Sequence, residues 1–583
     1  MVQLELEGDT VSTVVVTRDC ANVVCEGGEQ CRAGVCVSPE CSPERPDLCP
    51  EPECASDTDC AAGLDVCAVA RCASGVCLTG QDAASCGAGE VCNPFDGCIP
   101  ESCATPRSQV IANWDVVPRQ TLRGPTDLGV MAFHEHGSRV VFSVDGAEVG
   151  RSASPTMNAR TGAPEHIVTL DPADYPDGPL ILSARAEPLC LGHDARDLPD
   201  LMLFVNAGGT LAEEARYVDC IAGSDEAAGT ELDPFRSVDR ALSDVPDGGT
   251  VWLAAGDCYI WPSDDAARER WTTIRPLEGL PAGAVEMRLR DPDAMASVHT
   301  RLRFVNVRLT AGVPDRFTRI VEVQEGGALW LDGTELDADP PDNEAQLNAP
   351  IYLTDGLVHG ISQVRPLFMR GTRVRNVRQC IGIQTNHIAV NVDVVGVGRA
   401  AIIGGFHPDG FVENLIVYGV RATRMGPQSL FGIQGRTQDV AIVNTLVESH
   451  PPGQVGAAQL LGGWEHALFW HLTVVGTPTI IRGEVLRVAV ENGLFLQLGE
   501  SEEPVGWRVR NNHYLVPNSS GETLGDFFTL GDAAFVDAAN DDYRLSPESP
   551  ATNTGRELLD VPFDALGRPF GAGSRAAGAF APE

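Results

Sequence analysis

The C-terminal half of the chain repeats one pattern of hydrophobic and polar positions. Each copy opens with an apolar pair, crosses a polar turn, and ends in an apolar, largely β-branched run that carries an Asn or its substitute. Four copies align by eye, and they span Ile383–Gly396, Ile403–Gly419, Ile433–Val447 and Leu460–Gly476. A spacing of roughly 20–30 residues is typical of stacked supersecondary units.

The short apolar runs favour strands over helices. A helical repeat would place apolar residues at i, i+3, i+4 and i+7, whereas these runs are Val/Ile-rich and bounded by Gly, Asn and Pro. A chain that lays down two or three short strands per repeat, over many repeats, builds a parallel β-helix. We therefore expect a rod with a long side groove, a shape that suits a long polymer such as a polysaccharide.

A short helix is expected to close the start of this rod. Pro234 suits the first turn of a helix over Pro234–Leu242. Its apolar face would carry Phe235, Val238, Ala241 and Leu242. That face can cover the end of the rod, which would otherwise expose a sheet edge and a core. We expect Cys220 and Cys258 to staple this cap to the first coil.

Both ends of the region resemble secreted and surface right-handed parallel β-helix proteins of the pectate-lyase-like type. The entry segment is Tyr217–Tyr259, which begins YVDCIAGSD and continues through DPFRSVDRAL to GGTVWLAAGDCY. The closing segments are Ala534–Gly555 and Phe563–Phe580. The resemblance implies that residues 211–583 form one right-handed parallel β-helix.

Residues 105–210 show the period-two alternation of strands. Gly129–Arg151 reads as strand, VDG turn and strand, and Asp171–Pro188 contains another alternating run. Val140–Gly146 and Asp177–Ala186 resemble motifs of bacterial immunoglobulin-like domains. The resemblance implies a β-sandwich, which in such proteins is normally a spacer.

Cysteines concentrate in residues 1–104. Fifteen of the nineteen lie between Cys20 and Cys103, and Asp57–Cys77 looks like a second copy of Arg18–Cys36. A zinc module would need C-x2-C pairs and His, which this segment lacks, so we expect disulfides formed in an oxidising compartment. The segment resembles Cys-rich repeats of myxobacterial surface proteins. Because fifteen is odd, a Cys103–Cys190 bridge would even the count, although sequence does not establish the pairing.

The net charge of the chain restricts the classes of partner that it can bind. The net charge is −39, and all 42 basic residues are Arg, so no lysine can act as a general base. A nucleic-acid partner requires a cationic face, so we expect none. An acidic protein also repels polyanions unless its groove is locally basic.

The N-terminal residues and the cysteines bear on location. Residues 1–19 lack the basic and apolar regions of a signal peptide, and no apolar run reaches the roughly 18 residues of a membrane span. Together with the cysteines, this predicts an extracellular or outer-surface protein whose leader or lipid anchor was removed.

Stacking of the repeats predicts a column of polar and aromatic side chains, since equivalent positions on successive coils lie ~4.8 Å apart. An indole can stack on a sugar, a carboxylate and an imidazole can transfer protons, and Arg can hold a uronate. These could also be ordinary turn residues, and a slip of one residue would turn a side chain to the other face. The expected glycan contacts are His387, His407, Asp409, Arg436, Trp464, Glu465 and His466.

Metal binding is suggested at two places, and we assign no metal ligand from the sequence. Close oxygen ligands suit Ca²⁺, which is the one cofactor left open, but the acidic segment Asp332–Ala345 lacks the Gly and the terminal Glu of an EF-hand. We therefore favour a solvated acidic loop for this segment over a calcium site. His134 and His136 would share one face of a strand, which leaves a metal pair open.

Two classes of function remain. The order of disulfide module, sandwich and rod is typical of cell-surface display, which favours a non-catalytic glycan-binding or adhesion protein. The alternative is a polysaccharide lyase or glycoside hydrolase that acts in the β-helix groove. β-Helix lyases commonly use Lys or Arg as the base, and here only Arg could serve.

Overall fold

The structure is a computed structural model, and the chain divides into two compact units, residues 1–107 with 190–192, and residues 108–189 with 193–583. The residues that it describes are 30–32, 35–37, 54, 56–60, 68–73, 76–81, 90–93, 97–100, 103, 108–190, 192–260, 268–289, 296–310, 321–323, 327–337, 351–353, 367–375, 379–383, 388–390, 393–395, 400–404, 411–425, 431–449, 458–476, 479–482, 487–496, 498–500, 507–515, 527–540, 542–570 and 576–582.

The described part of the first unit contains three antiparallel hairpins. Their strands are β1 (Gln30–Arg32) with β2 (Val35–Val37), β3 (Ala68–Ala73) with β4 (Val76–Gln81), and β5 (Glu90–Asn93) with β6 (Gly97–Pro100). In each hairpin the register sets two cysteines opposite one another: Cys31 and Cys36, Cys72 and Cys77, Cys92 and Cys98. The sequence repeat is therefore a hairpin with a cysteine on each strand. A disulfide joins Cys103 to Cys190.

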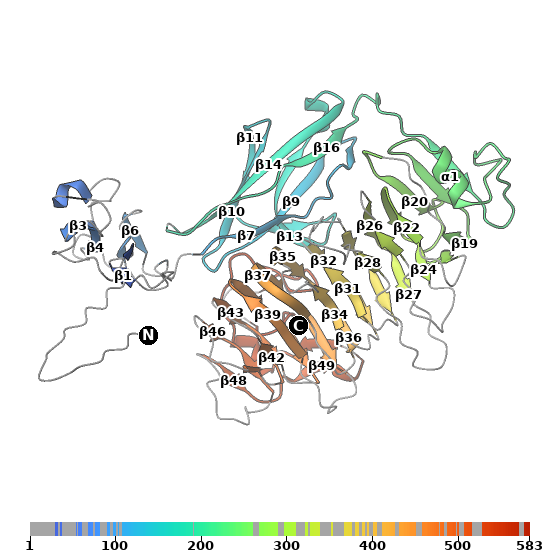
Figure 1. Cartoon of the computed structure of the whole chain (residues 1–583). Coiled ribbons are helices and arrows are strands. Elements are labelled where there is room, and N and C mark those ends of the chain that lie inside the picture. Colours follow the sequence, from blue (N-terminus) through green and yellow to red (C-terminus); the bar gives the residue numbers. More distant parts are fainter. Residues whose placement is uncertain are drawn as a thin grey trace, which may run out of the picture. The chain divides into compact units, whose positions relative to one another are not determined.

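Residues 108–206 form a sandwich of two antiparallel-rich sheets (Figure 1). One sheet is β11-β10-β14-β16-β8 with β15 beside β14, and the other is β12-β13-β9-β7. Alternate residues of both sheets, such as Phe142, Leu182 and Val130, fill one shared core. The strands are β7 (Ile111–Trp114), β8 (Thr121–Leu122), β9 (Thr126–Phe133), β10 (Ser138–Val144), β11 (Ala147–Ser152), β12 (Thr156–Asn158), β13 (Ala163–Leu170), β14 (Gly178–Pro188), β15 (Arg196–Asp197) and β16 (Leu201–Val205).

The rod consists of two parallel sheets, which we call the long sheet and the short sheet. Successive coils pair in register, so the predicted fold class, an all-β chain with a right-handed parallel β-helix after a β-sandwich and a disulfide-rich module, is confirmed. The domain boundaries at 104 and 210 stay predictions.

The described strands of the long sheet are β17 (Ala215–Val218), β18 (Thr250–Leu253), β20 (Thr272–Pro276), β22 (Ala296–Val298), β23 (Arg301–Val305), β25 (Val321–Val323), β26 (Ala328–Asp332), β28 (Ile351–Leu353), β29 (Leu367–Arg370), β31 (Gln379–Ile383), β32 (Ile388–Val390), β34 (Ala400–Gly404), β35 (Phe411–Tyr418), β37 (Phe431–Val443), β39 (Ala458–Trp464), β40 (Ala467–Trp470), β42 (Thr479–Arg482), β43 (Val488–Glu491), β45 (Leu498–Glu500) and β46 (Trp507–Arg510). Those of the short sheet are β19 (Gly256–Ile260), β21 (Val285–Leu289), β24 (Arg308–Thr310), β27 (Glu335–Asp337), β30 (Arg373–Arg375), β33 (Asp393–Val395), β36 (Arg421–Met425), β38 (Leu446–Ser449), β41 (Thr473–Val475), β44 (Leu494–Phe495), β47 (His513–Tyr514) and β48 (Thr529–Leu530).

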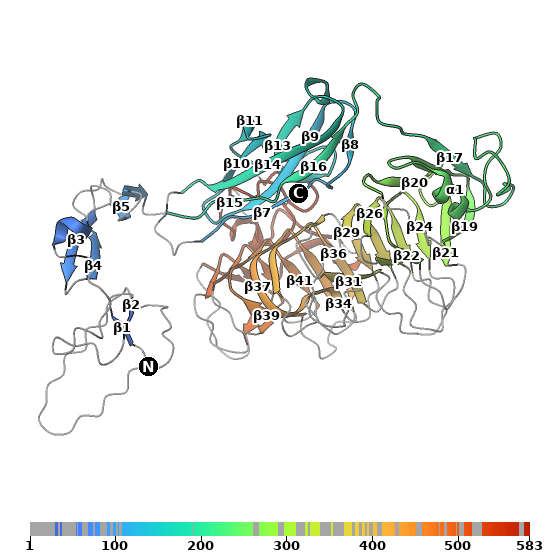
Figure 2. The ribbon, with the colours of Figure 1, turned by 45° about the horizontal axis from the view of Figure 1, so that its top comes forward.

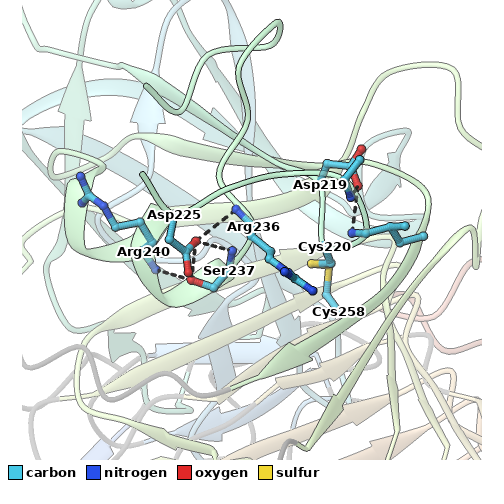
Figure 3. Close-up of a disulfide and its surroundings, with 9 residues drawn as sticks. Asp219, Cys220, Asp225, Arg236, Ser237, Arg240 and Cys258 are labelled. Carbon is cyan, nitrogen blue, oxygen red and sulfur yellow. Dashed lines mark hydrogen bonds between the residues drawn. A yellow bond between two sulfur atoms is a disulfide. The ribbon is translucent and has the colours of Figure 1, made fainter. Parts of the chain in front are cut away.

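A helix caps the first coil, but it begins later than predicted. Helix α1 spans Val238–Asp244, because the Ser237 side chain accepts a hydrogen bond from the Arg240 N–H and sets the helix start there. Phe235 instead pairs with β17 and is buried with the apolar face of the helix. Figure 3 shows Asp225 accepting the backbone N–H groups of Arg236 and Ser237. The expected Cys220–Cys258 disulfide is present and ties the cap to β19.

The corner between the long and short sheets is a single residue in the left-handed conformation. This explains why most repeats carry an Asn or Gly after the apolar run, since these residues tolerate positive φ best, while His471 takes this place in Leu460–Gly476. The described corner residues are Asn306, Gly333, Gly371, Gly419, Asn444, His471, Asn492 and Asn511, with φ between 51° and 66°.

The outward face of the long sheet is apolar over the later coils. Leu415–Tyr418, Val440–Val443 and Ala467–Trp470 are buried at every position. Alternate residues fill the rod, and their neighbours, among them Ile416, Tyr418, Ala441, Val443, Leu468 and Trp470, point outward. A strand with apolar residues at both parities is a strand covered on both faces.

The sandwich covers this outward face, so it is not the separate spacer that we expected. Ile111, Met131, Phe133 and Ala163 of β7, β9 and β13 share one apolar cluster with the outward residues of the rod. Strand β7 contacts β35 and β37 of the rod, and its ribbon can be followed along the rod in Figure 2. Asn414, at a left-handed corner in β35, accepts the Ala112 N–H at 3.1 Å and donates to the Ala112 carbonyl at 2.5 Å. The Trp271 indole donates to the Pro118 carbonyl at 2.6 Å.

The C-terminal tail covers the corner of the last coils. It contains β49 (Phe535–Asp537), β50 (Asp542–Leu545) and a 3-10 turn at Pro550–Asn553. Corner side chains hold its backbone: Asn444 donates to the Phe563 carbonyl at 2.8 Å, and Asn492 donates to the Arg556 carbonyl at 2.8 Å. The corner residues therefore turn the chain from the long sheet to the short sheet, and their side chains also bind the tail.

The docking of the sandwich on the rod can be tested at Leu468. We expect Leu468→Asp to split one calorimetric unfolding transition into two, because an unpaired carboxylate buried in the interface costs about 3 kcal/mol or more. Leu468→Met keeps the volume and should cost less than about 1.5 kcal/mol. A single, unshifted transition in Leu468→Asp would contradict the interface.

The corner conformation can be tested at Asn444, which is fully buried with φ 51°. Asn444→Gly should lose only the side-chain hydrogen bonds, each about 1 kcal/mol. Asn444→Ala should lose these and also about 1–2 kcal/mol of backbone strain. Denaturant midpoints should therefore fall in the order parent, Gly, Ala, and an alanine variant as stable as the glycine variant would refute the assignment.

Candidate functional site

The structure places the predicted glycan column only in part. His387, His407 and Asp409 lie outside the described residues. Arg436 lies in β37, where it pairs with Phe411 and Gly463, and Trp464 pairs with Thr437. Arg436 and Trp464 therefore occupy neighbouring rows rather than one row, and the column of seven residues remains a prediction.

His466 is buried rather than exposed. It is 8% exposed, and its Nδ1 lies 2.7 Å from Asp439 Oδ1. Asp439 forms an ion pair with Arg196 of the sandwich, whose Nε also donates to the Val110 carbonyl at 2.9 Å. Glu465, the neighbour of His466, is half-buried. His466 thus contributes to the contact between rod and sandwich.

The first acids of the proposed calcium loop are paired with arginines. Asp332 forms an ion pair with Arg303, and Asp337 lies 2.8 Å from Arg308, which also lies 3.9 Å from Glu335. Asp339, Asp342 and Glu344 lie outside the described residues. Across the described ranges no group of His, Cys, Asp and Glu is arranged to hold a metal ion.

An alternative contact surface lies on the outward face of the first coils. We call it the arginine–aromatic wall and define it as Tyr217, Trp252, Arg275 and Arg303. The register sets Tyr217, Trp252 and Arg275 in one row on successive coils, ~4.8 Å apart. All four side chains are half-buried, and the Arg275 guanidinium lies 4.6 Å from the Trp252 ring centre.

The wall carries two guanidinium groups that lie against indole rings. Arg303 stacks 3.8 Å from the Trp330 ring centre and is paired with Asp332. The Nε–H groups of Arg275 and Arg303 are buried and have no hydrogen-bond partner within the described part of the chain, so they are closed to a ligand. The terminal N–H groups of a guanidinium beside an indole can hold a carboxylate or sulfate while the aromatic ring contacts a sugar face.

Sequence reasoning missed the wall, although a signal was present. The alternating strands Thr250–Leu253, Thr272–Pro276 and Arg301–Val305 carry Trp or Arg at their outward positions. The later strands carry apolar residues there. A comparison of the residues at the outward positions of successive strands would have separated the open coils from the covered ones.

A buried ionic network joins the rod, the tail and the sandwich. The Glu491 side chain is fully buried and accepts from Arg508 Nε at 2.7 Å, Arg510 Nε at 2.9 Å and Arg556 Nε at 2.6 Å. Burial alone would raise the pKa of Glu491, but the three arginines outweigh it and lower the pKa. Arg508 also pairs with Glu135 of the sandwich.

A second buried carboxylate anchors the tail to the sandwich. Asp560 accepts the His134 N–H at 2.8 Å and the Ser138 N–H at 2.9 Å. Burial raises the pKa of Asp560 to about 7 despite these hydrogen bonds. Both carboxylates are inaccessible, so we assign them to assembly of the fold rather than to chemistry on a substrate.

Comparison with known proteins gives similar solved structures but no family. No family model matches the chain, and no curated protein matches it. Pectate lyase Pel9A is 12% identical, with a TM-score of 0.36 over 64% of this chain and 98% of that chain. A rhamnogalacturonan lyase is 12% identical (TM-score 0.29; 55% and 86% covered), and the GH136 lacto-N-biosidase from Eubacterium ramulus is 10% identical (0.30; 54% and 66%). At these identities and TM-scores, none of them says what this chain does.

The Glu491 network predicts a pH-dependent contribution to stability. Because the folded pKa of Glu491 lies below its ordinary value of 4.5, the contribution is present above pH 4.5 and is lost as the pH falls through the folded pKa. Glu491→Gln should destabilise the fold by about 3–5 kcal/mol at pH 7. Its deficit against the parent should shrink below pH 4.5.

Thermal unfolding at pH 7, 5 and 3.5 would measure this difference. Glu278→Gln, which alters an exposed acid, is the control and should match the parent at each pH. An equal deficit for Glu491→Gln at all three pH values would show that the carboxylate charge is not what the arginines stabilise.

Proposed function

We propose that this protein is an extracellular or cell-surface protein that binds an acidic polysaccharide without cleaving it. The observation that carries the proposal is the arginine–aromatic wall, a half-exposed row of Tyr217, Trp252 and Arg275 with Arg303 beside it. In a chain of net charge −39, half-buried guanidinium groups next to an indole favour a uronate or sulfate group on a sugar.

The location rests on the disulfides and on the sequence resemblances. Cys103–Cys190 and Cys220–Cys258 require an oxidising compartment to form and persist. The resemblance of the first unit to myxobacterial surface repeats and of the sandwich to immunoglobulin-like domains supports the same location. In the part of the chain that is described, no helix has the length and apolar character of a membrane span.

The extent of the wall fits an extended polymer. Its strands belong to consecutive coils of the rod, so the wall runs along the rod axis. A chain laid along that axis would meet one side chain of the row per coil, first the aromatic Tyr217 and Trp252 and then the cationic Arg275. We infer repeated weak contacts rather than one deep pocket, which suits binding without bond cleavage.

Binding to polygalacturonate, with dextran as the neutral polymer, tests this proposal. We expect Arg275→Gln to weaken polygalacturonate binding about tenfold or more, because a hydrogen bond to a charged group contributes about 1.5–3 kcal/mol and 1.4 kcal/mol is tenfold. Trp252→Ala should weaken it about threefold to tenfold through the lost aromatic contact of about 0.5–1.5 kcal/mol. Affinity should also fall with salt.

Arg236→Ala, which alters an exposed arginine of the cap, is the matched control and should bind like the parent. Unfolding midpoints should confirm that the variants are folded. Unchanged affinity in Arg275→Gln would overturn the assignment of the wall. Release of unsaturated products at about 235 nm, or of reducing ends, would favour the lyase or hydrolase alternative instead.

A further inference from the structure

Two carboxyl groups meet inside the sandwich, next to its contact with the rod. Glu165 in β13 is fully buried, and Asp115, which directly follows β7, is 3% exposed. Strand β9 lies between β13 and β7, and the Asp115 N–H donates to the carbonyl of Gly129 in β9 at 3.0 Å. A Cβ atom on Gly129 would lie 1.4 Å from Glu165 Oε2. The Glu165 carboxyl therefore crosses β9 over a residue without a side chain, and it comes within hydrogen-bonding reach of Asp115.

The hydrogen bonds of this pair lack one donor. Glu165 Oε2 accepts from Asn158 Nδ2 at 2.9 Å, and Glu165 Oε1 accepts from the Thr161 hydroxyl. Asp115 Oδ1 is paired with Arg370 of β29, whereas Asp115 Oδ2 is buried and has no donor among the described residues. Two ionised carboxylates can only accept hydrogen bonds. A proton on Glu165 makes its carboxyl a donor, and the resulting O–H···O⁻ bond satisfies Asp115 Oδ2.

The charges around the pair favour one bound proton over none. Arg370 balances one of the two negative charges and also donates to the Asp115 backbone carbonyl. Arg160, in the turn before β13, acts on both carboxylates and on Asp332, but it is exposed, so solvent screens its charge. Burial raises the pKa of Glu165 well above its ordinary value of 4.5, and Asp115 raises it further. The hydrogen bonds from the two donors of Glu165 offset only part of this effect.

We propose that Glu165 and Asp115 share one proton and form a latch that holds the sandwich to the rod until alkaline pH removes the proton. Deprotonation leaves two buried carboxylates against one guanidinium, and their repulsion weakens the hold of Asp115 on Arg370. In the register of the long sheet Arg370 lies beside Asp332, which is paired with Arg303 of the arginine–aromatic wall. Release of the latch therefore loosens the sandwich at the edge of the wall, whether or not the wall binds a glycan.

Infrared spectroscopy of the full-length protein at pH 7 tests for the shared proton, because a protonated carboxyl group has a carbonyl stretch that a carboxylate lacks. We expect the parent to show this band with more intensity than Glu165→Gln. Asp560, whose pKa burial raises to about 7, contributes equally to both spectra. Glu278→Gln, which alters an exposed acid, should give the parent spectrum in this region.

Unfolding by denaturant from pH 5 upward measures the same proton. Unfolded Glu165 loses its proton above its ordinary pKa of 4.5, whereas folded Glu165 keeps it, so unfolding releases one proton. Relative to Glu165→Gln, the folding equilibrium constant of the parent should therefore fall about tenfold per pH unit, up to the pKa of folded Glu165. The glutamine variant should remain folded, because its amide replaces the protonated carboxyl as a donor.

Hydrogen exchange tests the latch itself. As the pH is raised from 7 to 10, backbone amides of residues 111–115 and 367–370 should exchange faster in the parent than in Glu165→Gln at the same pH. Equal infrared intensity in parent and Glu165→Gln, or a parallel pH dependence of their stabilities, would show that Glu165 is ionised and would overturn the shared proton. Equal exchange in both proteins at every pH would overturn the latch.

Discussion

The fold depends on how the outward face of the long sheet is covered. A coil of a parallel β-helix buries one face of each strand in the rod, and the other face must meet water or a partner. Over the coils that contain Ile416, Ala441 and Leu468, that other face is apolar. The sandwich and the tail supply the missing layer, and polar corner residues fix both in place. Asn414 and Asp439 bind the sandwich, and Asn444 and Asn492 bind the tail.

This arrangement divides the rod into a covered part and an open part. The later coils carry apolar outward residues under the sandwich, whereas the first coils carry Trp252, Arg275 and Arg303. The boundary is marked by Trp271 and Trp330, which pack against Val117 of the sandwich. The described outward face of one sheet is therefore of two kinds, apolar under the sandwich and aromatic and cationic on the first coils.

The sequence predicted local features better than long-range ones. The rod, the cap and the strands of the sandwich all rest on short motifs whose physical meaning is local: a β-branched apolar run between Gly, Asn and Pro, a Pro before a helix, a VDG turn. Alignment of repeats by eye could not establish register, because loops of unequal length separate the strands. Arg436 consequently pairs with Phe411 rather than with the aligned turn. The sandwich contact was missed because no single strand reveals its partner, although Leu415–Tyr418 and Ala467–Trp470, apolar at both parities, indicated a second covered face.

The hydrogen bonds between Ala112 and Asn414 join residues 302 positions apart. The sandwich is synthesised well before the coils that it covers, so its apolar outer sheet must wait for them. Contacts of such separation slow folding, and exposed apolar surface in the interval favours aggregation. A chain released in pieces or cut short would carry this surface permanently. Folding of this protein therefore passes through a stage in which the apolar face of the sandwich is exposed, and this stage is not visible in the final structure.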